Sequence, residues 1–275
     1  MENKKDYSEW LIVSDIDGTL NNKLRRTPRV NIEAIDSFVH GYKGHFTLAS
    51  ARSVPSMRPH YLNLPDVKTP AIILNGAGIY DYQKEEMMWF NPIKESAVEI
   101  IREAMKKFPF LEVGVFCSDM IYLVRPRIMS EVMMMIDRLP FKRFRTIDDV
   151  PKGNWGKVIC FCPFGQTKTI RKFFSERIGE EHYLIDTGPV SFDLVDKNTN
   201  KGYAVGVLSS MLGIDKENIS AIGDYYNDWD MLKSVSHPAC AGQAPEDIKK
   251  ICEFVACHCN KGAVADLINY IKKTY

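Results

Sequence analysis

The sequence lacks any long apolar segment and any excess of charge of one sign. No apolar run approaches the roughly 18 residues of a transmembrane helix, and the run near the N-terminus is too short for a signal peptide. The 36 basic and 35 acidic residues give a net charge of +1, which argues against a dedicated polyanion binder or membrane-surface protein. We therefore expect a cytoplasmic protein with no nucleic-acid partner and no membrane contact.

The chain also lacks the paired cysteine spacing of a structural zinc site. Its seven cysteines are an odd set, and several lie in apolar segments, where a reduced thiol behaves as a small hydrophobe. Cys257-His258-Cys259, with Cys252 nearby, suggests a metal site, but C-x-C is not the C-x-x-C spacing of structural zinc and no second pair follows. We expect reduced cysteines and assign no role to Cys252, Cys257 or Cys259.

No repeats or low-complexity segments are present, and the length of 275 residues fits one large or two smaller domains. Strands alternate with helices at both ends of the chain, which predicts a parallel sheet with right-handed crossovers. The middle mixes paired strands with helices, as an α+β insertion does. We predict an α/β fold, with a Rossmann-like doubly wound core over 1–82 and 190–275 and an inserted α+β cap over 83–189. In the cap, the run Met133-Met134-Met135 could line a pocket or fill the core.

The first predicted strand ends in two carboxylates. The apolar run Leu11-Ile12-Val13 delivers Asp15 and Asp17 to the carboxyl end of this strand. Because side chains alternate with a period of two, both start on the same face, and Gly18 lets the backbone turn away. Taken alone, this pair is more often a helix N-cap and a turn aspartate.

Polar side chains also follow later predicted strands or open the helices after them. They are Ser50 and Arg52, Lys201, and Asp224 with Asn227 and Asp228. Ligands of an open parallel sheet bind outside the carboxyl ends of its strands, so these groups should converge with the first two acids. Acids can hold Mg²⁺, while a hydroxyl and an ammonium suit phosphate oxygens. Each group alone has a structural explanation, but their joint occurrence favours a site for a metal and a phosphate.

These motifs resemble those of the haloacid dehalogenase superfamily, in the Cof-type or sugar-phosphatase branch with a C2B-type cap inserted after the third core strand. The matching segments, in family order over nearly the whole chain, are Asp15-Ile16-Asp17-Gly18-Thr19-Leu20, Ser50-Ala51-Arg52, Asn75-Gly76-Ala77, Asn200-Lys201-Gly202, Gly223-Asp224-Tyr225-Tyr226-Asn227-Asp228 with Met231-Leu232, and Asn260-Lys261-Gly262-Ala263-Val264-Ala265. The D-x-D-G-T-L and G-D-x-x-N-D motifs together are highly specific. Where relatives carry Thr-Gly-Arg, Ser50 keeps the hydroxyl and Ala51 adds a Cβ that could alter the phosphate pose.

The resemblance implies a role for each matched residue. Asp15 would be the nucleophile that forms an aspartyl-phosphate, and Asp17 the general acid and base. Mg²⁺ would be the cofactor, held by Asp15, Asp224 and the backbone carbonyl of Asp17. The residues implied in phosphate binding are Ser50, Lys201 and Asn227, and those implied in support are Arg52, Asn75 and Asp228.

The implied activity is Mg²⁺-dependent hydrolysis of a small phosphomonoester, such as a sugar phosphate or similar metabolite, with specificity set by the cap. The partner would be that phosphorylated small molecule, and the chain a monomer or small homo-oligomer. A phosphotransferase or phosphomutase that passes the phosphoryl group to a second hydroxyl is one alternative. A noncatalytic regulator on this fold is another, and the intact Asp15, Asp17, Lys201 and Asp224 argue against it.

Overall fold

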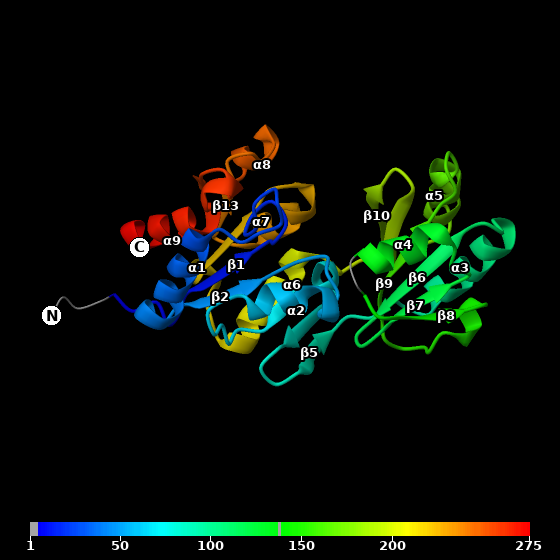
Figure 1. Ribbon diagram of the computed structural model, residues 1–275, viewed down its shortest axis with the longest axis horizontal. Helices are drawn as coiled ribbons and strands as arrows, with labels where there is room; N and C mark the ends of the chain where they lie inside the picture. Colours follow the sequence, from blue (N-terminus) through cyan, green and yellow to red (C-terminus); the bar gives the residue numbers. More distant parts are fainter. Residues whose placement is uncertain (1–4, 137–138) are drawn as a thin grey trace. The chain divides into compact units, whose positions relative to one another are not determined.

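The computed structural model describes residues 5–136 and 139–275, and the chain divides into two compact units (Figure 1). The core unit takes in the described residues up to Ala51, together with Met57–Met88 and Asn200–Tyr275. The inserted unit comprises Arg52–Ser56 and Trp89–Thr199. Among the described residues, no helix has both the length and the apolar character that crossing a bilayer requires.

A five-stranded parallel sheet in the order β14-β13-β12-β1-β2 forms the centre of the core unit. Its strands are β1 (Leu11–Ser14), β2 (His45–Leu48), β12 (Ile219–Gly223), β13 (His237–Cys240) and β14 (Phe254–Val255). The strands of such a sheet are covered on both faces and are therefore apolar throughout. Accordingly, every residue of β1 and of β12 is buried.

A third strand joins this sheet beside β2. In β3 (Ala71–Ile73), Ile72 forms a parallel bridge with Ala49, which follows β2. The chain then turns back through β4 (Gly78–Asp81), antiparallel to β3, and β5 (Glu86–Phe90) completes a three-stranded sheet. The predicted order of the first three strands is thus present.

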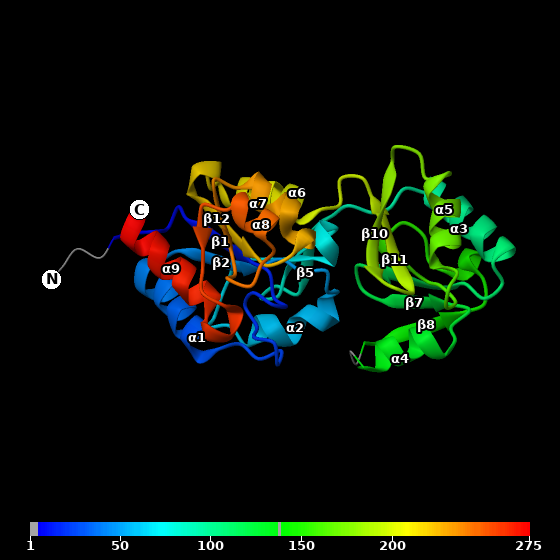
Figure 2. The ribbon, with the colours of Figure 1, turned by 90° about the horizontal axis from the view of Figure 1, so that it is seen from above.

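Helices cover both faces of the core sheet. On one face, α1 (Arg29–Asp36) packs beside α9 (Ala263–Thr274), and on the other lie α6 (Lys201–Leu212) and α7 (Trp229–Ser234), as Figure 2 shows. The core unit also contains α8 (Glu246–Lys250) and α2 (Val54–Leu62), and the first turn of α2 is grouped with the inserted unit. This arrangement confirms the predicted doubly wound α/β core.

Residues at its two ends determine where α6 begins and ends. The side chain of Asn200 accepts a hydrogen bond from the Tyr203 N–H at 2.7 Å, which satisfies a free donor at the first turn. Gly213 ends the helix in a left-handed conformation at φ 68° that a residue with a Cβ adopts less readily. Both residues fix where the helix begins and ends, and therefore where Lys201 stands.

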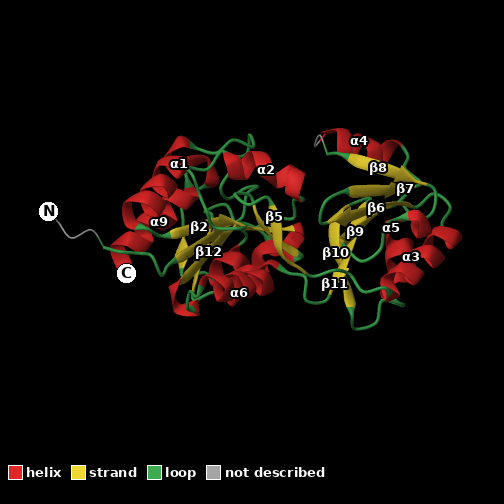
Figure 3. Ribbon diagram, turned by 90° about the horizontal axis from the view of Figure 1, so that it is seen from below, coloured by secondary structure: helices red, strands yellow, loops and turns green. Residues whose placement is uncertain are grey.

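The inserted unit has a six-stranded sheet in the order β10-β11-β9-β6-β7-β8. Its strands are β6 (Glu112–Cys117), β7 (Ile121–Val124), β8 (Phe141–Phe144), β9 (Trp155–Phe161), β10 (His182–Gly188) and β11 (Ser191–Asp196). Its helices α3 (Ser96–Lys107) and α5 (Thr167–Ser175) bury apolar side chains against one face, and α4 (Ile128–Ile136) lies on the other side (Figure 3). Paired strands and helices make this the α+β insertion expected.

One segment that the predicted bounds place in the core belongs to the other unit. The segment 192–196, assigned to the core, is β11, which pairs antiparallel with β9 and β10. This register places Phe192 opposite Cys160, and Phe192 and Leu194 join the apolar cluster beneath α3 and α5. The inserted unit therefore extends to Thr199 rather than 189, and on its other side it begins at Trp89 rather than 83.

A carboxylate ties the end of the chain to the core sheet. Glu253 accepts hydrogen bonds from the hydroxyls of Tyr275 at 2.5 Å and Tyr270 at 2.8 Å, and it pairs with Nδ1 of His237 at 2.8 Å. Burial by itself would raise the pKa of Glu253, but these three partners outweigh burial and hold the pKa below its usual value.

We expect Glu253→Gln to lower the melting temperature by roughly 2–6 °C at neutral pH. A carboxyl whose pKa is lower in the folded than in the unfolded chain adds stability above its unfolded pKa, and this stability is lost as the pH falls through the folded pKa. The two proteins should therefore melt at increasingly similar temperatures below pH about 4.5. Thermal melts from pH 7 to pH 3.5 measure this, and a constant difference would contradict it.

Candidate functional site

The ammonium group of Lys201 lies between two carboxylates beyond the end of β1. Its Nζ is 2.5 Å from Oδ1 of Asp15 and 2.6 Å from Oδ1 of Asp228. Asp15 follows β1, Lys201 opens α6, and Asp228 ends the short 3-10 helix η5 (Tyr226–Asp228) after β12. All three side chains are buried, and only 1% of Lys201 is exposed. Three segments distant in sequence thus meet at one ion-pair network.

Asp224 brings a third carboxylate to this network. Among the described residues, Asp15, Asp224 and Asp228 each offer an oxygen within 4.8 Å of the others. Oδ2 of Asp228 also accepts the backbone N–H groups of Asp224 at 3.0 Å and Tyr225 at 3.4 Å. Both oxygens of Asp228 are therefore engaged within the protein, so it holds the loop and Lys201 in place, whereas Asp15 and Asp224 are better placed to bind a ligand.

The charges of this cluster do not balance. Burial raises the pKa of Asp15 to about 8, with a further rise from Asp228 that Lys201 only partly opposes. Burial and Asp228 raise the pKa of Asp224 to about 6. Burial would lower the pKa of Lys201, but Asp15 and Asp228 outweigh it and keep the pKa above its usual value. Three carboxylates facing one ammonium favour an additional cation, and hard carboxylate oxygens fit Mg²⁺.

Asp17 differs from the buried acids in its exposure. Asp17 is exposed, and its backbone forms an isolated parallel β-bridge with Asn21. Its carboxylate is not one of the three that cluster around Lys201. Gly18 then turns the chain at φ 88°, and a Cβ built on it would lie 2.3 Å from Oδ2 of Asp224. Glycine is therefore required where this turn passes Asp224.

Ser50 and Asn75 meet beside the start of α6. The buried Ser50 follows β2, and its carbonyl accepts the Asn75 N–H at 2.9 Å. Asn75 is left-handed at φ 58°, and its buried Oδ1 has no hydrogen-bond partner among the described residues. A Cβ on Gly76 would lie 2.2 Å from the carbonyl oxygen of Asn200, next to Lys201. The strained turn thus touches the segment that carries the buried ammonium.

Two other predicted residues have contacts of different kinds. Asn227 is exposed, and its Nδ2 lies 3.4 Å from Oδ1 of Asp228. Arg52 is grouped with the inserted unit and donates to Oγ of Ser56 at 3.0 Å. The structure therefore brings Asn227 into contact with Asp228 of the cluster, while Arg52 contacts Ser56 in the first turn of α2.

The sequence analysis missed Gln243, which joins three segments of the site. Its Nε2 donates to the Gly18 carbonyl at 2.5 Å and lies 3.4 Å from Oδ2 of Asp224, and its Oε1 accepts the Cys259 N–H at 3.1 Å. Gln243 follows β13, so the strand-end rule that identified the other residues would have included it.

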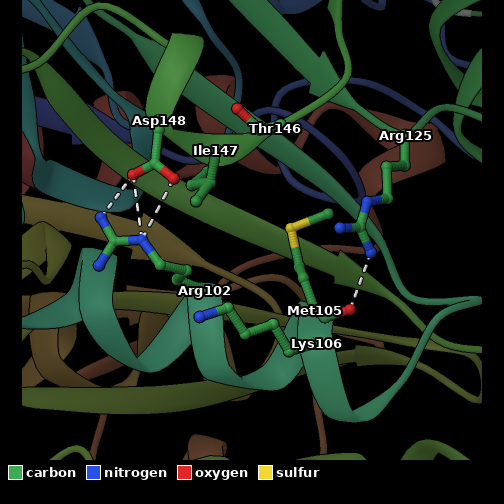
Figure 4. A pocket seen from close by; sticks show the side chains of 7 residues that line it. All are labelled: Arg102, Met105, Lys106, Arg125, Thr146, Ile147 and Asp148. Atoms are coloured by element: carbon green, nitrogen blue, oxygen red, sulfur yellow. Dashed lines mark hydrogen bonds and ion pairs between the residues drawn. The ribbon is translucent and has the colours of Figure 1, made fainter.

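The inserted unit has a pocket of about 210 Å³ with a different character. Figure 4 shows its lining residues, which are Arg102, Met105, Lys106, Arg125, Thr146, Ile147 and Asp148. Nε of Arg102 donates to Asp148 at 3.0 Å, and Nη1 of Arg125 donates to the Met105 carbonyl at 2.8 Å. Both guanidinium groups are bonded within the protein, so the charged cluster in the core unit remains the stronger candidate site.

We expect Lys201→Met to lower the free energy of unfolding by about 3–5 kcal/mol, because it leaves two buried carboxylates without their cation. Urea denaturation at pH 7.5 in the presence of EDTA measures this effect. Adding Asp228→Asn to the Lys201→Met variant should restore part of the lost free energy of unfolding, since one unpaired charge is then removed. Lys197→Met, at an exposed lysine four positions away, is the control. Equal losses for the two lysine variants would contradict the role of the buried network.

Solved structures share the whole fold. A haloacid dehalogenase-like hydrolase from Bacteroides thetaiotaomicron superposes with a TM-score of 0.85 at 22% identity, covering 97% of this chain and 100% of the other. A sugar phosphatase of subclass IIB of the same superfamily gives a TM-score of 0.76 at 18% identity, covering 95% of this chain and 98% of its own. At these identities the likeness establishes the fold.

Sequence relatives cover most of this chain. The chloroplastic endoribonuclease YBEY of Arabidopsis thaliana is 22% identical over 278 residues, 94% of this chain, but this chain spans only 45% of that protein. A putative phosphatase of Buchnera aphidicola subsp. Acyrthosiphon pisum is 24% identical over 230 residues, 81% of each chain. The family model for haloacid dehalogenase-like hydrolases matches residues 12–268, from β1 into α9. The resemblance carried by the motifs is thus confirmed, and this chain belongs to the haloacid dehalogenase-like hydrolase family.

Proposed function

We propose that this chain hydrolyses a small phosphomonoester, such as a sugar phosphate or similar metabolite, through an aspartyl-phosphate and with Mg²⁺. The observation that carries the proposal is the buried ammonium of Lys201 between Asp15 and Asp228, with Asp224 beside them. The names of the Buchnera relative, a putative phosphatase, and of the structural neighbour, a sugar phosphatase, support the reaction type.

Asp15 is the proposed nucleophile. A carboxylate oxygen attacks phosphorus in line, the bond from phosphorus to the ester oxygen breaks, and that oxygen leaves with a proton. Water then attacks the aspartyl-phosphate and loses a proton, which releases inorganic phosphate and restores the carboxylate. Mg²⁺, held by Asp15, Asp224 and the backbone carbonyl of Asp17, would supply positive charge against the acids and the phosphoryl oxygens.

Asp17 is the proposed proton carrier. In the first half-reaction it gives its proton to the leaving oxygen, and in the second it takes one from water. Its exposure supports this role, because an exposed carboxyl exchanges protons with solvent, whereas the buried Asp15 is tied to Lys201.

The phosphoryl group needs donors for oxygens that carry spread charge. Two of the three N–H bonds of the Lys201 ammonium serve Asp15 and Asp228, which leaves, among the described residues, one donor for a phosphoryl oxygen. Ser50 and Asn227 are the further proposed donors, with Arg52, Asn75 and Asp228 in support.

We also propose that the inserted unit acts as the cap that selects the substrate, while the core unit carries the chemistry. In support, the proposed catalytic and metal-binding residues all belong to the core unit. The balanced net charge of +1 fits a phosphorylated small molecule better than a nucleic acid or a membrane surface. A monomer or small homo-oligomer in the cytoplasm suits such an enzyme.

Replacing Asp15 by Asn tests the nucleophile. We expect turnover of a panel of phosphate esters to fall by more than about 1000-fold, because an amide does not attack phosphorus and the aspartyl-phosphate cannot form. Released phosphate is measured with Mg²⁺ and, separately, with EDTA, which should suppress the wild-type rate. Asp36→Asn, at an exposed aspartate of α1, is the control. Undiminished turnover of the Asp15 variant would refute the mechanism.

Product analysis distinguishes hydrolysis from phosphoryl transfer. With excess sugar added as an acceptor, we expect all phosphate from the ester to appear as inorganic phosphate, since water is the proposed second nucleophile. Phosphorylated acceptor, separated by anion-exchange chromatography, would instead identify a phosphotransferase. No turnover of any ester, despite bound Mg²⁺, would favour a noncatalytic regulator.

A further inference from the structure

Gln243 has the contacts of a residue whose amide orientation is fixed. The Gly18 carbonyl oxygen can only accept a hydrogen bond, and the Cys259 N–H can only donate one. Nε2 must therefore face Gly18, at 2.5 Å, and Oε1 must face Cys259, at 3.1 Å. The second hydrogen of Nε2 is then available to Oδ2 of Asp224, at 3.4 Å.

These contacts bring together three backbone segments at the acidic cluster. Gly18 belongs to the turn after Asp15, Asp224 follows β12, and Cys259 begins the 3-10 helix η6 (Cys259–Lys261). The turn passes so close to Asp224 that a Cβ on Gly18 would lie 2.3 Å from Oδ2. Gln243 bonds to both sides of this contact, so it sets the position of the Asp224 carboxylate relative to the chain that carries Asp15.

We propose that Gln243 is a positioning residue that presents Asp224 to the divalent cation. Its amide donates to Oδ2 of Asp224 at 3.4 Å and so holds the carboxylate in one orientation. Hydrogen bonds to ligating carboxylates fix the orientation of the ligand, and their loss typically weakens metal affinity. The inference rests on the proposed Mg²⁺-dependent function, but it concerns metal binding and can be measured without turnover.

A purely structural role makes a different prediction. If Gln243 only joined the Gly18 turn to the Cys259 segment, its loss would lower the melting temperature and leave the Mg²⁺ affinity of the folded protein unchanged. If it positions Asp224, the Mg²⁺ concentration for half-maximal activity should rise, and kcat at saturating Mg²⁺ should largely recover. A change in melting temperature alone therefore indicates the structural role, and a change in Mg²⁺ affinity indicates the positioning role.

The experiment compares Gln243→Met, which keeps the length of the side chain without its hydrogen bonds, and Gln243→Asn, which keeps the amide but shortens its reach. Isothermal titration calorimetry with MgCl₂ should show a Kd about 10–100-fold higher for both variants than for the wild type. Gln83→Met removes a comparable amide, which donates to the Val67 carbonyl at 3.4 Å elsewhere in the core unit, and should leave the Kd unchanged.

The outcomes are distinguishable. Wild-type Kd values in whichever of the two Gln243 variants folds would overturn this inference and leave the proposed function intact. A wild-type chain that binds no Mg²⁺ would overturn the metal requirement of the proposed function, and the inference with it. Weaker Mg²⁺ binding in the Gln243 variants, with the Gln83 control unchanged, supports the positioning role.

Discussion

The site depends on the burial of one ammonium group. Lys201 is almost completely inaccessible, and a buried charge is stable only when it is paired and hydrogen-bonded. Its partners come from the end of β1 and from the loop after β12, so the chain must bring both to the start of α6. This requirement extends to residues without a charge. A Cβ on Gly76 would meet the backbone of Asn200, and a Cβ on Gly223 would lie 2.4 Å from Oδ2 of Asp228.

The same network explains how one site can attract both a cation and an anion. Three carboxylates against one ammonium leave negative charge that burial makes costly, and the raised pKa values of Asp15 and Asp224 reflect this cost. In the proposed function, a divalent cation at these acids would reduce this cost, because its two charges and that of Lys201 balance the three carboxylates. In that proposal the cation and the remaining donor of Lys201 both bind the phosphoryl group, so we expect metal and substrate to favour each other's binding.

The sequence predicted the elements of the core and the residues of the charged network, because polar groups at the ends of apolar strands are visible in the order of residues alone. The prediction from the sequence was wrong where the partner of a strand depends on contacts with residues distant in the chain. The segment 192–196 has apolar residues at 192, 194 and 195, which indicates a buried strand but does not say to which sheet the strand belongs. Its place in the inserted unit follows from pairing with β9 and from the packing of Phe192 beneath α3 and α5.

The two acids of the first motif show a second limit. Alternation along an extended strand predicts that Asp15 and Asp17 start on one face, yet Asp15 is buried and Asp17 is exposed. The strand ends at Ser14, so both acids lie beyond the extended segment to which the alternation applies. This difference in exposure suits the two tasks that we propose for these acids, since a nucleophile benefits from a fixed, enclosed position and a proton carrier from contact with solvent. Gln243 bonds to the Gly18 carbonyl, directly after Asp17, and to Asp224, so a residue that the motifs do not reveal helps to fix the turn that follows these two acids.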